Sequence, residues 1–156
     1  MEFDTFYIEY RGKVFGYLLR MTGDRDLSLD LAQESFTRCL ERYSKVPNPV
    51  PLVFTIARNL VYDNHRWQSK WDAREAPEQQ DESNPEKMLL EREKGQHIAL
   101  SMQRLPDNER EILALVVTRT LSYKEIAGIT GISEANVKVR VHRARKNLRQ
   151  FLEDKQ

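Results

Sequence analysis

Apolar residues recur at every third or fourth position along much of this 156-residue chain. That spacing puts them on one side of an α-helix and gives each helix a face to bury. In the first segment the apolar face consists of Phe3, Phe6, Tyr7, Tyr10, Val14, Tyr17, Leu18 and Met21. No stretch alternates apolar and polar residues in the way that a half-buried strand does. The sequence therefore predicts an all-α fold.

Glycine, aspartate and proline mark the expected helix boundaries in the first half. We expect Gly23 to end the first helix and Asp26 to cap a second. The apolar residues of that second helix are Leu27, Leu31, Phe36, Leu40 and Tyr43. Residues 47–51, Pro-Asn-Pro-Val-Pro, are expected to exclude regular helix because proline lacks a backbone N–H. A third helix is then predicted from about Leu52 to Trp71.

The net charge of +1 is distributed unevenly along the chain. Residues 1–74 carry 11 basic and 10 acidic side chains, residues 75–95 carry 3 and 7, and residues 96–156 carry 11 and 7. The middle segment is acidic and polar and holds two prolines, which is typical of a solvated linker. We therefore predict an N-terminal domain over residues 1–74, a linker over 75–95 and a C-terminal domain over 96–156.

The second half of the expected third helix interleaves basic, amide and aromatic side chains from Arg58 to Trp71. Such a mixture suits single-stranded or melting nucleic acid, because cations hold phosphates while rings stack on unpaired bases. The alternative is an ordinary amphipathic helix in which Trp67 and Trp71, four residues apart, pack on the core. The residues alone leave both interpretations open.

After the linker, Asn84 and Pro85 are expected to start a helix that runs to about Leu105. Asp107 is a candidate cap for the next helix. The apolar face of that helix is Ile112, Leu113, Leu115 and Val116, with Leu121 beyond it.

The next residues predict a helix-turn-helix. Ser122 and Glu125 match the capping box, in which the serine oxygen accepts from one orphan amide and the glutamate from another. Ala127 is small where the two helices would cross, Gly131 supplies the turn, and Val137 of the second helix can pack against the first.

Ser133 is expected to cap a long last helix from Glu134 to about Leu152. Its buried arc would be Val137, Val141, Ala144, Leu148 and Phe151. Six basic residues and no acidic one lie between Ala135 and Leu152. A major-groove helix has this charge, because contacts to phosphates supply affinity and the first turns of the helix read base edges. The alternative is a merely solvated basic face. The capped helix-turn-helix frame favours DNA binding.

These residues resemble a known family. Residues 105–145, LPDNEREILALVVTRTLSYKEIAGITGISEANVKVRVHRAR, are similar to the promoter-binding C-terminal domain of bacterial RNA polymerase sigma factors. Residues 30–36, DLAQESF, and 56–60, IARNL, followed by Asp63, are similar to the N-terminal domain of that family. With two domains and a short linker, the chain resembles the extracytoplasmic-function (ECF) subfamily over about residues 3 to 152.

The resemblance implies a sigma factor that directs promoter recognition and melting, performs no bond chemistry and needs no cofactor. It implies contact with core RNA polymerase through Asp30, Gln33 and Glu34. It implies contact with the melting −10 element through Arg58, Asn59, Tyr62, Asp63 and Arg66. For the upstream −35 element it implies Tyr123, Lys124, Asn136, Lys138, Val139, His142, Arg143 and Lys146. By family analogy, an anti-sigma factor would clamp both domains.

Three features depart from the family pattern. Leu52 stands where the family often has tryptophan, so ring stacking there is lost. The proline-rich loop before the third helix has no readable base preference. Ala135-Asn136-Val137 replaces a Gly-Thr-Val pattern, and Asn136 can bond adenine or serve only as a solvated or capping residue.

Other classes of protein fit less well. A stand-alone helix-turn-helix regulator would usually dimerise on palindromic half-sites, but the chain has no sustained heptad repeat. The three histidines are far apart in sequence and Cys39 is the only cysteine, so no metal site or disulfide is expected. With no membrane-length apolar run and no signal-peptide pattern, the chain is expected to be soluble and cytoplasmic, without membrane insertion.

Overall fold

A computed structural model describes residues 2–70, 98 and 100–154, and the side chains of residues 65–70 are not described. All regular structure in this part of the chain is helical, which confirms the all-α prediction. The expected linker over 75–95, the helix start at Asn84, Trp71 and His97 lie outside the described residues. Of the described helices, none is both long enough and apolar enough to cross a membrane.

The first half is a bundle of three helices, α1 (Phe3–Thr22), α2 (Arg25–Arg42) and α3 (Pro49–Lys70), with a short 3₁₀ turn, η1 (Tyr43–Lys45), after α2. Aromatic rings fill the core between them. Phe6 meets Phe36 edge-on with ring centroids 5.7 Å apart, and Tyr17 meets Phe54 at 5.9 Å. The expected apolar face of α1 is buried apart from its edge, where Tyr7 is partly exposed.

The boundary between α1 and α2 is confirmed at Gly23 but shifted at the cap. Gly23 has a φ of 69°, the left-handed conformation that glycine adopts without strain. Asp24, not Asp26, caps α2, because its side chain directly follows the turn and accepts a bond from the amide of Leu27 at 3.1 Å. Asp26 lies in the first turn of α2, where its negative charge interacts favourably with the helix dipole.

The prolines before α3 do not exclude helix, and this prediction was wrong. The helix begins at Pro49, so Pro49 and Pro51 both lie in its first turn. The first amides of a helix have no partner inside the helix, so proline loses nothing there. Asn48 accepts a bond from the amide of Val50 at 3.2 Å. The expected cap at Asp107 is also shifted by one residue. Asp107 is the first residue of its helix, and Pro106 occupies the cap position.

The second half contains α5 (Asp107–Val116), α6 (Tyr123–Thr130) and α7 (Glu134–Glu153), and residues 100–103 before them are also helical. The capping box of Ser122 and Glu125 is present, Gly131 ends α6 in the left-handed conformation, and Ser133 caps α7. Ile126 and Val137 are fully buried between the helices. The predicted helix-turn-helix is therefore confirmed.

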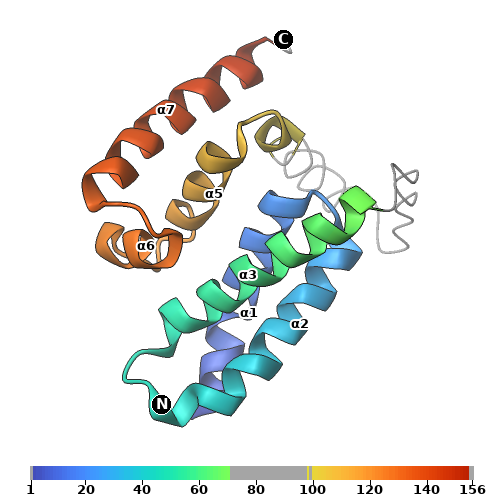
Figure 1. Cartoon of the computed structure of the whole chain (residues 1–156), viewed down its shortest axis with the longest axis vertical. Helices are drawn as coiled ribbons and strands as arrows, with labels where there is room; N and C mark the ends of the chain where they lie inside the picture. The colour runs from blue at the N-terminus through green and yellow to red at the C-terminus, as the bar shows by residue number, and fades with distance from the viewer. Residues whose placement is uncertain (1, 71–97, 99, 155–156) are drawn as a thin grey trace, which may run out of the picture.

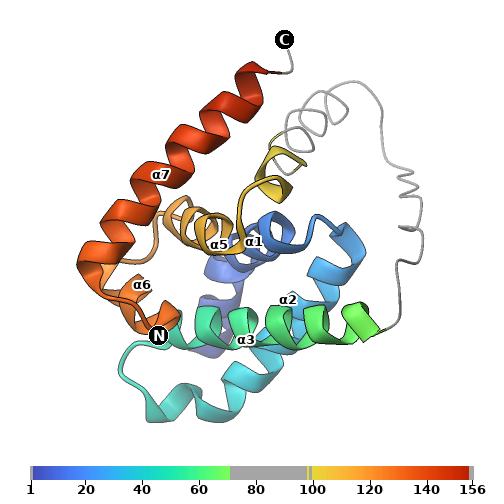
Figure 2. The ribbon, with the colours of Figure 1, turned by 45° about the horizontal axis from the view of Figure 1, so that its top comes forward.

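The two halves pack against each other. Helix α5 lies against α1 and α6 lies against the start of α3, whereas α7 lies on the outside (Figures 1 and 2). Buried apolar residues of both halves belong to one continuous cluster. No pattern in the sequence predicts this contact.

Candidate nucleic-acid and polymerase interfaces

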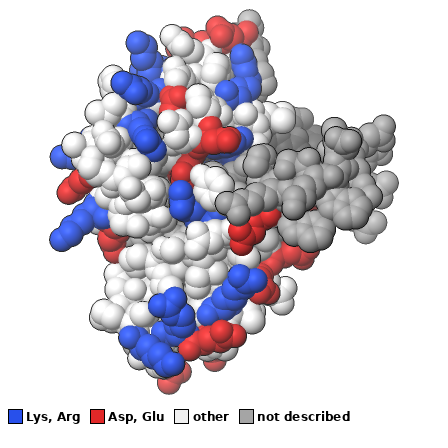
Figure 3. Space-filling view, in the orientation of Figure 1, with Lys and Arg blue, Asp and Glu red and all other residues white. Residues whose placement is uncertain are grey.

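The outer face of α7 is basic, and no acidic residue lies between Ala135 and Leu152. Its inner face is made of Val137, Val141 and Ala144, which are buried. The predicted residues on the opposite face are all exposed, namely Asn136, Lys138, Val139, His142, Arg143 and Lys146. Val139 is the apolar member of this face and is 45% exposed. Lys and Arg side chains gather along this helix in the space-filling view (Figure 3).

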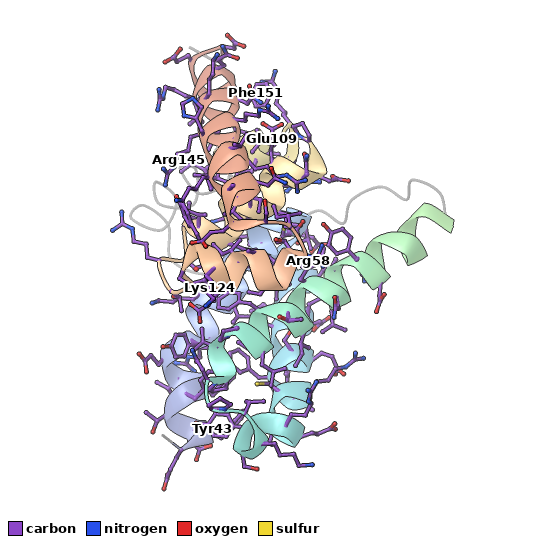
Figure 4. The ribbon with its side chains drawn as sticks, turned by 60° about the vertical axis from the view of Figure 1, so that its left-hand side comes forward. Tyr43, Arg58, Glu109, Lys124, Arg145 and Phe151 are labelled. Carbon is purple, nitrogen blue, oxygen red and sulfur yellow. The ribbon has the colours of Figure 1, made fainter. Side chains whose placement is uncertain are left out.

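Helix α6 brings two further predicted residues next to this face. Tyr123 and Lys124 occupy the first turn of α6, which the capping box fixes in place. Lys124 is exposed and Tyr123 is half-buried. Figure 4 shows Lys124 on α6 and Arg145 on α7, both directed away from the core. Phosphate contacts from this turn would be compatible with base contacts from α7.

The outer face of α2 carries the predicted polymerase-binding residues. Asp30, Gln33 and Glu34 are exposed one turn apart, and Glu34 accepts a hydrogen bond from Arg38 at 2.7 Å. Leu40 was expected in the core but is 54% exposed, because the buried stripe of α2 runs one position earlier, through Cys39. Cys39 is buried in this stripe, where a free cysteine packs as a small hydrophobic side chain.

Helix α3 divides the predicted melting residues between two faces. Asn59 and Asp63 are exposed, whereas Arg58 and Tyr62, also one turn apart, are half-buried and face α5. The backbone of Arg66 continues the helix, and its side chain is outside the described residues. The structure therefore does not bring all five residues to one surface.

Glu111 of α5 explains the inward orientation of that pair. The Arg58 Nε donates to one carboxylate oxygen of Glu111, and the Tyr62 hydroxyl donates to the other at 2.9 Å. The guanidinium of Arg58 also lies over the Tyr62 ring, 4.8 Å from its centroid. We call Arg58, Tyr62 and Glu111 the interdomain triad.

The buried carboxylate perturbs the groups around it. Burial, together with the negative charge and hydrogen bond of Glu111, raises the pKa of Tyr62 to about 12. Burial lowers the pKa of Arg58, but the hydrogen bond and charge of Glu111 outweigh that effect, so this pKa lies above its ordinary value. Burial and then the charge of Glu111 raise the pKa of Tyr17 as well. The charge of Glu111 thus keeps its neighbours protonated.

The titration of Tyr62 tests this contact. The pKa of Tyr62 is higher in the folded chain than its ordinary value of 10.0, so protonated Tyr62 stabilises the folded chain below pH 10. This contribution to the free energy of unfolding decreases as the pH rises toward 12. We expect Glu111→Gln to lower the Tyr62 pKa toward its ordinary value of 10.0. Phenolate absorbance, with the trace of Tyr62→Phe subtracted, measures it. An unchanged Tyr62 titration in Glu111→Gln would show that the two side chains are not in contact.

Sequence reasoning missed Glu111. Its signal was a charge at an apolar position, because Glu111 lies next to Ile112 and one turn before Leu115, both fully buried. A carboxylate on such a stripe requires a partner. Nothing local identifies that partner, since Arg58 is 53 residues away in the chain.

A helical domain followed by a helix-turn-helix with a basic outer helix defines a class of two-region DNA-binding proteins. Comparison of the chain with known families and relatives identifies the family within this class. Residues 6–70 match the family model of Sigma-70 region 2, and residues 96–148 match that of Sigma-70, region 4. The ECF RNA polymerase sigma factor SigM of Bacillus subtilis (strain 168) is 35% identical, over 96% of this chain and 94% of the relative. The RNA polymerase sigma factor CarQ of Myxococcus xanthus is 29% identical, over 96% and 88%.

A solved structure shares the fold across both halves. The sigma factor RpoE from Bartonella quintana, solved in complex with the anti-sigma factor NepR, has a TM-score of 0.78 at 21% identity. The likeness covers 97% of this chain and 96% of that one. The chain belongs to the family of ECF RNA polymerase sigma factors. It is thus a non-enzymatic factor that acts with RNA polymerase in transcription initiation, as the sequence predicted.

Proposed function

We propose that the chain reads the −35 element with α7 and the start of α6. The exposed basic face of α7 between Ala135 and Leu152 carries this proposal. It offers Asn136 and Arg143 for hydrogen bonds to base edges and Val139 for a thymine methyl, while Lys124 and Lys146 hold phosphates. Tyr123, Lys138 and His142 complete the surface.

Helix α3 engages the −10 element as the duplex opens. Asn59 and Asp63 are exposed and can bond to an extruded base, and Tyr62 can stack on one. Flipping a base costs a few kcal/mol, which these contacts must offset. Arg58 and Arg66 supply positive charge for the strand that carries the base.

The outer face of α2, with Asp30, Gln33 and Glu34, binds core RNA polymerase. In this arrangement residues 1–74 and 96–156 are two DNA-contacting domains, and the acidic segment 75–95 connects them. Family membership supports a cytoplasmic location, where polymerase and promoter DNA are found.

An anti-sigma factor that contacts both domains regulates the protein. One solved structure of the same fold is the sigma factor RpoE in complex with the anti-sigma factor NepR, and another is CnrH in complex with the cytosolic domain of CnrY. Recovery of core polymerase from the native cell without any second small protein would contradict this proposal.

The test of promoter reading is transcription by core polymerase with and without the chain on a library of genomic promoters. Promoter-directed initiation that requires both components is the expected result. A gel shift adds a second criterion. A stand-alone regulator binds duplex promoter DNA by itself, whereas this chain should bind it well only when core polymerase is present.

Two substitutions on α7 test whether its basic face contacts the −35 element. Lys138→Ala and Arg143→Ala are each expected to cost about 1–3 kcal/mol of discrimination at the −35 element. Run-off transcription on promoters with and without that element measures this loss. Lys13→Ala, an exposed cation on α1, is the matched control and should change nothing. Weaker polymerase binding by either α7 variant would contradict the assignment of faces.

A further inference from the structure

Acidic side chains occur in α7 only at its two ends. The helix begins with Glu134 and ends with Glu153, and six lysine and arginine residues lie between them. Glu134 is exposed. A carboxylate is unfavourable on a surface that binds DNA, because the phosphate backbone repels it. The basic character of the helix therefore does not account for Glu134.

The start of α7 does not depend on a hydrogen bond from Glu134. Ser133 caps the helix, and its side chain accepts from the amide of Asn136 at 3.1 Å. In a capping box the glutamate is the third residue of the helix, and Asn136 occupies that position here. Among the described residues, the carboxylate of Glu134 has no hydrogen bond or ion pair. A base that bonds to it therefore displaces no partner within this part of the chain.

Glu134 lies at the edge of the exposed basic face of α7. At about 100° per residue, Lys138 lies about 40° and Arg145 about 20° from Glu134 around the helix. Both cations are exposed, and Figure 4 shows Arg145 directed away from the core. The carboxylate is thus in line with side chains that the proposed function turns toward DNA.

The position of Glu134 along α7 places it close to bases. In a helix-turn-helix, the N-terminal residues of the recognition helix contact base edges in the major groove. Glu134 is the first residue of this helix. The start of α6, with the proposed phosphate contact of Lys124, belongs to the same DNA-binding surface. Because Glu134 cannot bind phosphate, a base edge is the part of DNA that it can bond.

The chemistry of the carboxylate selects one base. An ionised carboxylate accepts hydrogen bonds and donates none. In the major groove, cytosine presents the N4 amino donor, whereas guanine presents the N7 and O6 acceptors and thymine the O4 acceptor. Adenine presents its N6 donor beside the N7 acceptor, which repels a second carboxylate oxygen. Cytosine is therefore the base that suits Glu134.

We propose that Glu134 is a specificity-determining residue that accepts a hydrogen bond from the N4 amino group of a cytosine in the −35 element. This inference rests on the proposed reading of that element by α7. Lys138 and Arg145, on the same edge of the helix, offset the repulsion between the carboxylate and the phosphates. The remaining repulsion contributes to specificity, because a base without a donor leaves the charge unpaired in the groove.

Glu134→Ala and Glu134→Gln test the proposal in transcription with core polymerase. The template is a promoter library with a randomised −35 element, in which a barcode in the transcribed region identifies each promoter. We expect the native chain to favour cytosine roughly tenfold at one position. Glu134→Ala should lose this preference. Glu134→Gln should change it to adenine, because a glutamine amide bonds to both N6 and N7.

Glu153→Gln is the matched control. Glu153 is exposed at the other end of the same helix, and the substitution makes the same change in charge as Glu134→Gln. It should leave the base preference unchanged at every position. Glu134 also interacts favourably with the helix dipole, as an acidic residue in a first turn does. Loss of that effect lowers initiation from all promoters alike, so it does not change the base preference.

The base preferences decide the inference. It is overturned if the native chain and both Glu134 variants share the same preferences. It is also overturned if Glu134→Ala changes initiation equally for all four bases, or if the native preference that this variant removes is for a base other than cytosine. These outcomes leave the proposed function intact, because the native chain still initiates at promoters. A native chain that directs no promoter-specific initiation contradicts the proposed function itself.

Discussion

Replacing Ile126 by alanine is expected to destabilise the helix-turn-helix by about 2–5 kcal/mol and to abolish −35-dependent initiation. Ile126 is fully buried on α6, in the core shared with Val137 of α7. Removing three carbons there leaves a cavity that two short, capped helices cannot fill by shifting. Denaturant titration measures the free energy of unfolding, and run-off transcription measures the functional loss.

A graded series makes this result specific. Ile126→Val removes one carbon and should cost only about 0.5–1.5 kcal/mol, with most initiation retained. Because the α2 face lies in the other half, Ile126→Ala should still bind core polymerase. If Ile126→Ala lost polymerase binding as completely as initiation, α2 would not be an independent docking surface.

Local chemistry is the part of this fold that the sequence predicts well. The capping box of Ser122 and Glu125, the left-handed Gly131 and the Ser133 cap all form as expected, because each depends on residues within four positions. The errors are also local. A proline in the first turn looks like a helix breaker in sequence, yet Pro49 begins α3 because that position has no hydrogen bond to lose.

Contacts between distant segments could not be predicted from the sequence in the same way. The charge pattern identifies α7 as an exposed basic helix, and the burial of Val137, Val141 and Ala144 agrees with it. By contrast, the sequence assigns Arg58 and Tyr62 to an open surface, and the structure pairs them with Glu111. The residue types indicate that these polar and charged side chains need hydrogen-bond partners when they are buried. Which partner each side chain has depends on the packing of α5 on α1.

Charge reversal on α2 should have the largest effect on assembly. We expect Asp30→Lys combined with Glu34→Lys to weaken binding of core polymerase by roughly 100-fold, because like charges facing each other at an interface cost several kcal/mol. Both residues are exposed, and the ion pair of Glu34 with Arg38 is a surface pair that contributes little to stability. The fold is therefore retained, and binding measured by anisotropy with labelled chain reports the interface alone.

The matched control makes the same change in net charge on another helix. Asp4 and Glu9 are exposed on α1, and Asp4→Lys combined with Glu9→Lys should bind core polymerase as the native chain does. An equal loss in the α1 variant would mean that net charge, not the α2 face, governs association, since long-range attraction depends on total charge. Raising the salt concentration further distinguishes an effect of net charge from docking through the α2 face. Charges farther apart than the Debye length, about 8–10 Å at 0.1–0.15 M salt and shorter as salt is added, are screened, so added salt removes a net-charge effect, whereas charges in direct contact in a docked α2 face are screened much less.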